Sequence, residues 1–161
     1  FLNYVNLCSA RCHELTPQKK TLIAPYGTNL VRANDRFIRS LTELDVDFVA
    51  YQDEVGVRKT KVDKTKRLFE KLKIAHDKAG RSELWADIEL FDFEGIVYNS
   101  ALIPADFERV KKQIENVEPY VDKILGYQFL GLMNPPDSHS FAGHETSARF
   151  YEEYKKYMEE K

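Results

Sequence analysis

The sequence lacks long apolar runs and an excess of charge of either sign. The longest apolar runs fall far short of the ~20 residues that a membrane-spanning helix needs, so we expect no membrane span. The formal net charge is −2, and no basic stripe stands out, which argues against nucleic acid as the main partner. The cationic side chains are expected on solvated helix surfaces, as in Lys64, Lys66, Arg67, Lys71 and Lys73.

Cysteine is scarce, with 2 residues in 161. Cys8 and Cys12 lie four apart on a predicted helix, where a disulfide between them would be strained. A metal site would need further ligands beside them. We therefore expect two ordinary, buried or half-buried thiols, which indicate nothing firm about the redox compartment.

Motifs for phosphate, nucleotide and metal binding are also absent. There is no glycine-rich phosphate loop, no nucleophile elbow and no dinucleotide fingerprint. His139 and His144 flank a short polar segment without a recognised metal-ligand spacing. We expect no cofactor and no metal. An N-terminal signal pattern is missing too, and residues 1–3 resemble the inside of an element, so we expect residues upstream of them.

The composition is that of a soluble globular domain. Hydrophobic residues make up 43% of the chain and charged residues 31%, and the length suits one domain with a proper core. Neither a linker nor an internal repeat divides the sequence. We predict that residues 1–161 form a single domain.

Helical and strand-like segments alternate along the chain. Apolar spacing predicts helices over residues 1–15, 30–44, 62–79 and 104–117, and a last helix lined by Phe150, Tyr154 and Tyr157 with Met158 beside them. Runs typical of buried strands cover residues 21–26, 48–54, 84–91 and 124–129. Residues 92–103 are predicted to be a loop, Pro104 to lie in the first turn of the following helix, and no hairpin signal is present.

Four strands that alternate with helices predict an α/β fold with a parallel sheet. Such a unit is either a small open sheet or half of a (β/α)8 barrel, because a complete barrel takes about 250 residues. Three of the strands end in carboxylates or amides. Several strands that present polar groups to one mouth favour the half-barrel, since an open sheet concentrates them at one switch point.

The chain resembles the DUF4434 family. The resemblance rests on four motifs and on their order along nearly the whole chain: Tyr51-Gln52-Asp53-Glu54-Val55-Gly56-Val57, Leu84-Trp85-Ala86-Asp87-Ile88-Glu89-Leu90-Phe91, Pro104-Ala105-x-x-x-Arg109-Val110 and Lys123-Ile124-x-x-x-Gln128-Phe129. The resemblance implies the C-terminal half of a glycoside-hydrolase-like (β/α)8 barrel. It also implies that the full-length protein is secreted or periplasmic.

Family resemblance further implies a role for Glu89. It would lie near the end of the seventh barrel strand, where many retaining glycosidases of this fold keep their nucleophile. Their partner acid comes from the fourth strand, which this chain does not contain. The missing N-terminal half-barrel, or a second copy of the chain, would then complete the barrel.

Alternation places Trp85, Asp87 and Glu89 on one face of their strand and the apolar residues on the other. We expect the polar face to line the barrel interior, with Glu89 as nucleophile or general base, Asp87 orienting it and Trp85 in the floor. The alternative is a buried network of ion pairs or hydrogen bonds that ties strands together. Asp53, at the end of the neighbouring strand, is the predicted second carboxyl group, with a pKa raised by Glu89; otherwise it caps a turn.

Four more residues are predicted to bind substrate. Gln52 and Gln128 could hydrogen-bond sugar hydroxyl groups or satisfy barrel backbone, and Tyr26 and Tyr127 could stack on sugar rings or belong to the core. The leading hypothesis is thus a glycoside hydrolase that acts on a carbohydrate. The rivals are a non-catalytic carbohydrate-binding or scaffold protein on the same fold, and a small open-sheet signalling domain. A half-barrel leaves two sheet edges and an inner face uncovered, so we also expect a homodimer or the missing half.

Overall fold

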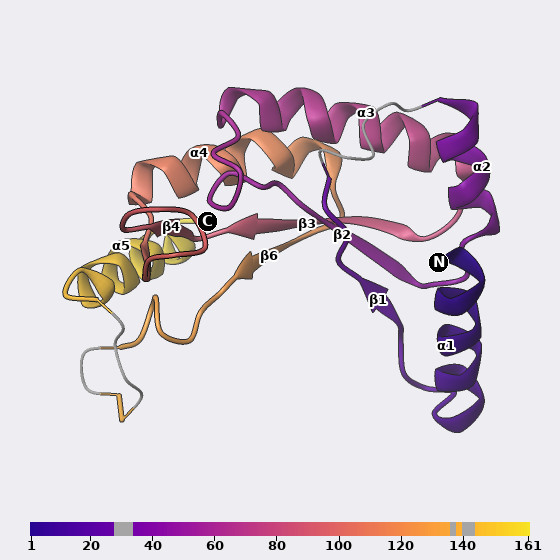
Figure 1. Ribbon diagram of the computed structural model, residues 1–161, viewed down its shortest axis with the longest axis horizontal. Helices are drawn as coiled ribbons and strands as arrows, with labels where there is room; N and C mark the ends of the chain where they lie inside the picture. Colours follow the sequence, from indigo (N-terminus) through magenta and orange to yellow (C-terminus); the bar gives the residue numbers. More distant parts are fainter. Residues whose placement is uncertain (28–33, 136–137, 140–143) are drawn as a thin grey trace.

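The computed structural model describes residues 1–27, 34–135, 138–139 and 144–161. Helices and strands alternate along most of it (Figure 1). The helices are α1 (Leu2–Leu15), α2 (Asp35–Glu43), α3 (Asp63–Ala79), α4 (Phe107–Val117), the 3-10 helix η1 (Glu118–Tyr120) and α5 (Ser147–Glu159). The strands are β1 (Leu22–Ile23), β2 (Phe48–Gln52), β3 (Glu83–Glu89), β4 (Phe91–Phe93), β5 (Leu102–Pro104) and β6 (Lys123–Tyr127).

Four strands form one parallel sheet in the order β1-β2-β3-β6. Gln52 pairs with Asp87, and Glu89 pairs with Tyr127. Paired residues of neighbouring strands point to the same face, so these side chains share one face of the sheet. The predicted parallel arrangement is confirmed, although each strand is shorter than its apolar run. The helix predicted over 30–44 is seen from Asp35, and its residues 30–33 lie outside the described part of the chain.

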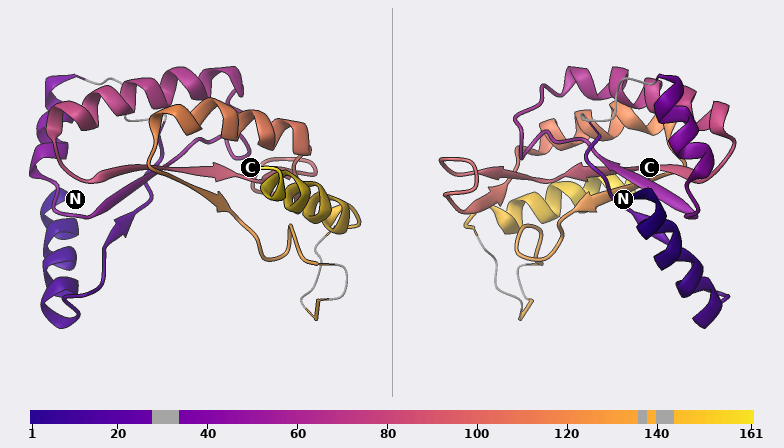
Figure 2. Two further views of the ribbon diagram at one scale, coloured as in Figure 1. Left: turned by 180° about the vertical axis from the view of Figure 1, so that it is seen from behind. Right: turned by 45° about the vertical axis from the view of Figure 1, so that its right-hand side comes forward.

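Helices α3 and α4 lie side by side over one face of the sheet, while its other face has no helix across its middle among the described residues (Figures 1 and 2). An open doubly wound sheet would carry helices on both faces. A barrel carries them only on the outside. The one-sided arrangement therefore agrees with part of a barrel and separates an outer, helix-covered face from an inner face.

Local sequence signals set the ends of these helices. The side chains of Asn34 and Asp106 cap α2 and α4 by accepting backbone N–H bonds from Phe37 and Arg109. Gly80 ends α3 in a left-handed conformation with φ of 64°, which a residue without a Cβ adopts at little cost. The predicted end of this helix at Gly80 is confirmed.

The core lies between the outer face and these helices. Phe69 and Leu72 of α3 and Val110 of α4 are almost completely buried against Leu84 and Ile88 of β3. A buried polar pair is included, because the Tyr51 hydroxyl lies 3.0 Å from Nε2 of His76. Burial lowers the pKa of His76, which keeps the imidazole neutral inside the apolar layer.

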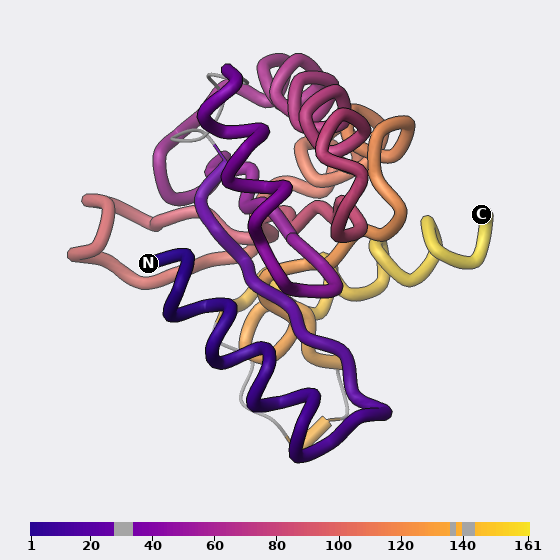
Figure 3. The backbone as a smooth tube through the Cα atoms, turned by 90° about the vertical axis from the view of Figure 1, so that its right-hand side faces the viewer, coloured from indigo at the N-terminus to yellow at the C-terminus, as the bar shows by residue number. Residues whose placement is uncertain are grey.

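The predicted loop over residues 92–103 is wrong, because most of this segment belongs to a two-stranded antiparallel hairpin, β4–β5. The hairpin projects to one side of the sheet (Figure 3). Its strands of three residues are too short to show alternation, and its eight-residue connection lacks a two-residue turn signal. Pro104 ends β5 instead of starting a helix, and α4 begins two residues after Ala105, at Phe107.

The thiols on α1 are not buried or half-buried as expected, since Cys8 and Cys12 are both exposed. The main buried side chain of α1 is Ser9, which shares a hydrogen bond with Thr21. Large apolar side chains of α1 are exposed as well, including Tyr4 at 69% and Leu7 at 68%. The amphipathic pattern is present, but no described element covers this part of the helix.

Replacing Phe69 by Ala is expected to lower the free energy of unfolding of this chain by about 3–5 kcal/mol, because it leaves a cavity between α3 and the sheet. Urea denaturation followed by circular dichroism measures the change. Ile74→Ala on the same helix is the matched control, since Ile74 is 49% exposed. Equal losses for the two variants would contradict the described packing of α3.

Candidate functional site

A cavity of about 440 Å³ opens at the carboxyl ends of the parallel strands. Strand ends and the β4–β5 hairpin supply its walls, and we call it the mouth cavity. Parallel α/β sheets and barrels place their active sites at this edge. The lining residues are Tyr26, Gln52, Val57, Glu89, Phe91, Phe93, Tyr98, Leu102 and Tyr127. Glu89 is the single carboxylate among them.

Glu89 ends β3 and faces this cavity with 3% of its surface exposed. Its Oε2 accepts a hydrogen bond of 2.7 Å from the backbone N–H of Val57, in the turn after β2. Among the described residues, no Lys or Arg side chain forms an ion pair with its carboxyl group. The carboxyl group is thus held by backbone and is not neutralised by a fixed cation.

Asp53 is completely buried behind Glu89 and does not line the mouth cavity. Its Oδ1 accepts hydrogen bonds from the backbone N–H groups of Glu89 (3.2 Å) and Val55 (3.3 Å). Its Oδ2 accepts one of 2.6 Å from Nε2 of Gln113 on α4. Asp53 therefore joins the end of β2 to the end of β3 and to the outer helix layer, and it touches the backbone of Glu89 instead of the cavity.

Helix α4 holds the other side of the Glu89 backbone. The Arg109 guanidinium donates hydrogen bonds of 2.9 Å to the carbonyl oxygens of Glu89 and Phe91, and Gln113 lies 3.3 Å from the Glu89 carbonyl. Arg109 and Gln113 are four residues apart, so they occupy one face of the helix. The terminal residue of β3 is fixed through both its N–H and its C=O group.

Burial raises the pKa of three carboxyl groups in this region. The pKa of Glu89 rises to about 7, through burial first and then the negative charge of Asp53. The pKa of Asp53 rises to about 6 through burial. The sequence predicts this rise in pKa, but through the charge of Glu89 and not through burial. Asp87 also reaches about 6, through burial and the charge of Asp53. Glu89 is thus near its titration midpoint at neutral pH, the range in which a carboxyl group can exchange a proton with a substrate.

The mouth cavity brings together four of the predicted site residues: Tyr26, Gln52, Glu89 and Tyr127. The Gln52 side chain donates a hydrogen bond to the Ala24 carbonyl, 3.1 Å away. One ring face of Tyr26 is covered by the Arg58 guanidinium, 5.1 Å from the ring centroid. The other predicted residues, Asp53, Asp87, Trp85 and Gln128, lie outside the cavity lining.

Asp87 and Trp85 share the inner face with Glu89 but lie deeper, toward the start of β3. Trp85 stacks on Phe48 at 4.2 Å between centroids, and Lys123 lies 4.8 Å over its indole. Four residues of strand separate Trp85 from Glu89, about 13 Å. No hydrogen bond joins the carboxyl groups of Asp87 and Glu89 among the contacts of the described residues. Their predicted contributions to the site stay predictions.

Sequence reasoning missed the hairpin and the turn after β2. Phe93, Tyr98 and Leu102 of the hairpin line the mouth cavity, and no pattern in residues 92–103 indicates this. Gly56 of the turn has no room for a side chain, because a Cβ there would lie 2.4 Å from the Phe91 carbonyl oxygen and 3.1 Å from Oε2 of Glu89. The polar pair at 109 and 113, beside the apolar stripe of α4, was a readable signal for the supporting helix.

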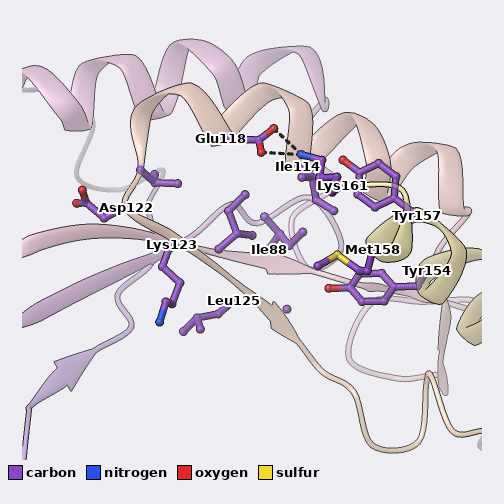
Figure 4. Close-up of a pocket in the computed structure, with 13 residues that line it drawn as sticks. Ile88, Ile114, Glu118, Asp122, Lys123, Leu125, Tyr154, Tyr157, Met158 and Lys161 are labelled. Carbon is purple, nitrogen blue, oxygen red and sulfur yellow. Dashed lines mark hydrogen bonds and ion pairs between the residues drawn. The ribbon is translucent and has the colours of Figure 1, made fainter.

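A smaller cavity of about 240 Å³ lies beside β6, between α4 and α5 (Figure 4). An ion pair of 2.6 Å between Lys161 and Glu118 crosses its upper side, next to Tyr157. Glu89 does not line this cavity, so the mouth cavity is the better candidate.

In the described part of the chain, no three His, Cys, Asp or Glu side chains gather closely enough to hold a metal ion. No described helix combines the length and the apolar character that crossing a lipid bilayer requires.

The buried carboxyl groups Asp53, Asp87 and Glu89 should contribute stability that falls as pH rises from about 4 to about 7, because the native state keeps protons that the unfolded state has already released. Burial of His76 acts in the opposite direction, so the contribution of Glu89 is isolated by substitution. Glu89→Gln should remove roughly 1–3 kcal/mol of this dependence. Urea unfolding at a series of pH values measures it. The matched control is Glu94→Gln, in the exposed part of the hairpin. If wild type and Glu89→Gln gave parallel curves, the raised pKa of Glu89 would be wrong.

A solved structure of a longer protein has a similar fold. The chain aligns over 99% of its length with a crystal structure from Bacteroides thetaiotaomicron VPI-5482, described as a "putative alpha-L-fucosidase", with a TM-score of 0.72 and 19% sequence identity. It covers 52% of that structure, so it spans about half the length of the protein that it matches. The alignment supports the fold, an α/β half-barrel, as the sequence predicts.

Comparison by sequence gives the family. No match was found among curated proteins. The family model described as "Domain of unknown function (DUF4434)" matches residues 1–140. The match covers most of the sequence and includes β2, β3, the hairpin, α4 and β6, which together build the mouth cavity and its support. The chain belongs to the DUF4434 family.

Proposed function

We propose that this chain supplies half of the active-site barrel of a glycoside hydrolase, in which Glu89 acts on the glycosidic bond. The observation that carries the proposal is the position of Glu89: a carboxyl group at the end of a barrel strand, in a cavity lined by aromatic rings and an amide. Tyrosine and phenylalanine rings can pack on the apolar faces of sugars, and Gln52 can hydrogen-bond a hydroxyl group. The substrate is thus a carbohydrate.

The contacts of Glu89 favour a catalytic over a purely structural role. The carboxyl group of Glu89 forms no ion pair with a described residue, and it lines the mouth cavity although it also accepts a hydrogen bond from the backbone N–H of Val57. As nucleophile or general base it must be ionised, and a pKa of about 7 leaves a large ionised fraction at neutral pH. Its backbone is fixed by Asp53, Arg109 and Gln113, which supplies the rigid support that a reacting group needs.

Glycoside hydrolysis requires a second carboxyl group at the sugar. The sequence predicts Asp53, but its complete burial favours a positioning role through the backbone of Glu89. We place the second carboxyl group in the other half of the barrel, outside this chain. The similarity to a protein twice as long supports such a division, and by family resemblance the complete protein is secreted or periplasmic.

A non-catalytic carbohydrate-binding protein is the second candidate. The aromatic lining of the mouth cavity favours it, because stacking needs no second carboxyl group. Binding of a glycan without cleavage by the complete barrel would support this alternative. A small open-sheet signalling domain has no comparable support, because α3 and α4 cover the same face of the sheet.

In the complete barrel, Glu89→Gln should lower kcat/KM for glycoside cleavage by about 10²- to 10⁴-fold, the range for loss of a group that transfers protons or attacks directly. Release of reducing sugar measures the rate, and wild-type kcat/KM should rise with pH through about 7 as Glu89 ionises. Glu94→Gln is the control on the exposed hairpin. Unchanged cleavage by Glu89→Gln would refute the assignment.

Both flanks of the half-barrel expose large apolar side chains, which a second barrel half is expected to cover. Leu7 on α1 is 68% exposed at the β1 flank, and Leu130 after β6 is 67% exposed at the other. Large apolar side chains left in water favour association with a partner that covers them. We propose that the other half-barrel, or a second copy of this chain, packs on these flanks.

Light scattering across a dilution series of this chain should therefore show a dimer whose dissociation constant rises by about tenfold or more in Leu7→Glu, since a carboxylate would be buried in an apolar contact. The control is Ile96→Glu at the tip of the hairpin, where the side chain is 72% exposed. A stable monomer at all concentrations would contradict self-association. It would leave the missing half as the expected partner.

A further inference from the structure

A second hollow, of about 720 Å³, lies along the first turns of α3 and the turn before it. We call it the basic groove. Its lining has six basic side chains and, among the described residues, no carboxylate. The lining residues are Arg58, Lys59, Thr60, Lys61, Lys64, Arg67, Leu68 and Lys71.

Most of this positive charge is uncompensated. Arg58 pairs with Glu54 at 2.7 Å, and Lys59 pairs with Asp92 at 2.6 Å. The other four cations of the groove form no ion pair with another described residue. On the same helix, by contrast, Lys73 pairs with Asp77 four residues later. A solvated helix surface normally mixes charges of both signs, so the groove departs from the expectation for scattered surface lysines.

The basic groove adjoins the mouth cavity. Val57 donates its N–H to Glu89 and lines the mouth cavity, and the next four residues, 58–61, line the groove. The Arg58 guanidinium lies 5.1 Å from the Tyr26 ring, and Nζ of Lys59 lies 5.9 Å from the Phe93 ring. Both rings belong to the mouth cavity. One short segment of chain therefore lines both hollows.

We propose that the basic groove binds anionic groups of the glycan whose glycosidic bond lies at Glu89. The substrate class is an acidic glycan that carries carboxylate or sulfate ester groups one or more sugars away from the cleaved bond. This inference rests on the proposed function, because it uses the mouth cavity as the place of the reacting bond. Arg67, which forms no ion pair with another described residue, can hold such groups through paired N–H donors. Lys61, Lys64 and Lys71 add positive charge.

The shape and place of the charge favour a glycan over nucleic acid. The formal net charge of the chain is −2. The six basic side chains of the groove form a local cluster beside the aromatic rings and the amide of the mouth cavity. Nucleic-acid binding relies on an extended basic surface that follows many phosphates. An acidic oligosaccharide needs only a local cluster, and the groove supplies one next to the predicted reaction site.

Binding is tested without cleavage, in the complete barrel with Glu89→Gln as the background. The test variant adds Lys64→Gln, Arg67→Gln and Lys71→Gln, which remove three unpaired charges from the groove. The control adds Lys66→Gln, Lys78→Gln and Lys155→Gln, which make the same change in net charge outside the groove lining. Calorimetry or fluorescence anisotropy measures the affinity for heparin oligosaccharides (sulfated), oligogalacturonates (carboxylated), neutral dextran oligomers and single-stranded DNA.

The groove variant should lose about tenfold or more in affinity for a sulfated or a carboxylated probe at an ionic strength of about 0.05 M, where screening is weak. The control should stay within about twofold, because its three side chains do not line the groove and so do not contact an anion bound there. The probe that shows the larger loss identifies the anionic group. Circular dichroism of both variants checks that they are folded.

Three results would overturn the proposal: equal losses in the two variants, no binding of either acidic glycan, or DNA binding that is tighter than glycan binding and equally sensitive to the groove variant. These outcomes are separable from the fate of Glu89. Unimpaired cleavage by Glu89→Gln would refute the proposed function while leaving the binding result intact. If the groove variant and its control bound the acidic glycans equally well while Glu89 was still required for cleavage, only the groove proposal would be refuted.

Discussion

The burial of the Asp53 carboxyl group is the constraint on which the arrangement of the site depends. A carboxyl group removed from water is costly unless hydrogen bonds compensate it. Here the donors come from the backbone of β3, the turn after β2 and Gln113 of α4. Movement of α4 would leave Oδ2 without its donor, and movement of β3 or of the turn would remove one of the two donors to Oδ1. The same contacts that hold the outer helix on the sheet therefore fix the last residue of β3, and the fold and the position of Glu89 are stabilised together.

Much of the fold could be predicted because its signals are local. Alternation in residues 84–91 separates the inner from the outer face, and Gly80 marks the end of α3. The hairpin could not be predicted, because strands of three residues carry no periodicity. The exposure of Cys8 could not either, since an amphipathic helix shows which side is apolar but not whether anything covers it.

For the site, the sequence indicated which residues lie at strand ends, but not whether their side chains line the cavity or are buried behind it. It predicted Glu89, Gln52, Tyr26 and Tyr127 near the carboxyl ends of the strands, and the structure brings these four side chains to one cavity. The sequence did not distinguish Asp53, whose side chain points to the helix layer, from Glu89, whose side chain points to the cavity. A shift of one position along a strand is enough to move a side chain from the cavity to the helix layer, because successive side chains alternate between faces. The basic groove could not be predicted from the order of residues either, because the basic residues look scattered along α3 until the helix places Lys64, Arg67 and Lys71 beside residues 58–61.

Position 56 carries a consequence for the evolution of this site. The turn after β2 approaches the Phe91 carbonyl and Oε2 of Glu89 so closely that even a methyl group has no space. An acid can be exchanged for another polar residue without moving the backbone, but this turn cannot accept any other amino acid without withdrawing its N–H from Glu89. The nearest atom to such a methyl group is a backbone oxygen of β4, so the restriction persists in any relative that keeps this turn against β4, whether or not it keeps Glu89. Loss of glycine at position 56 would therefore mark relatives in which the turn has moved away from β4.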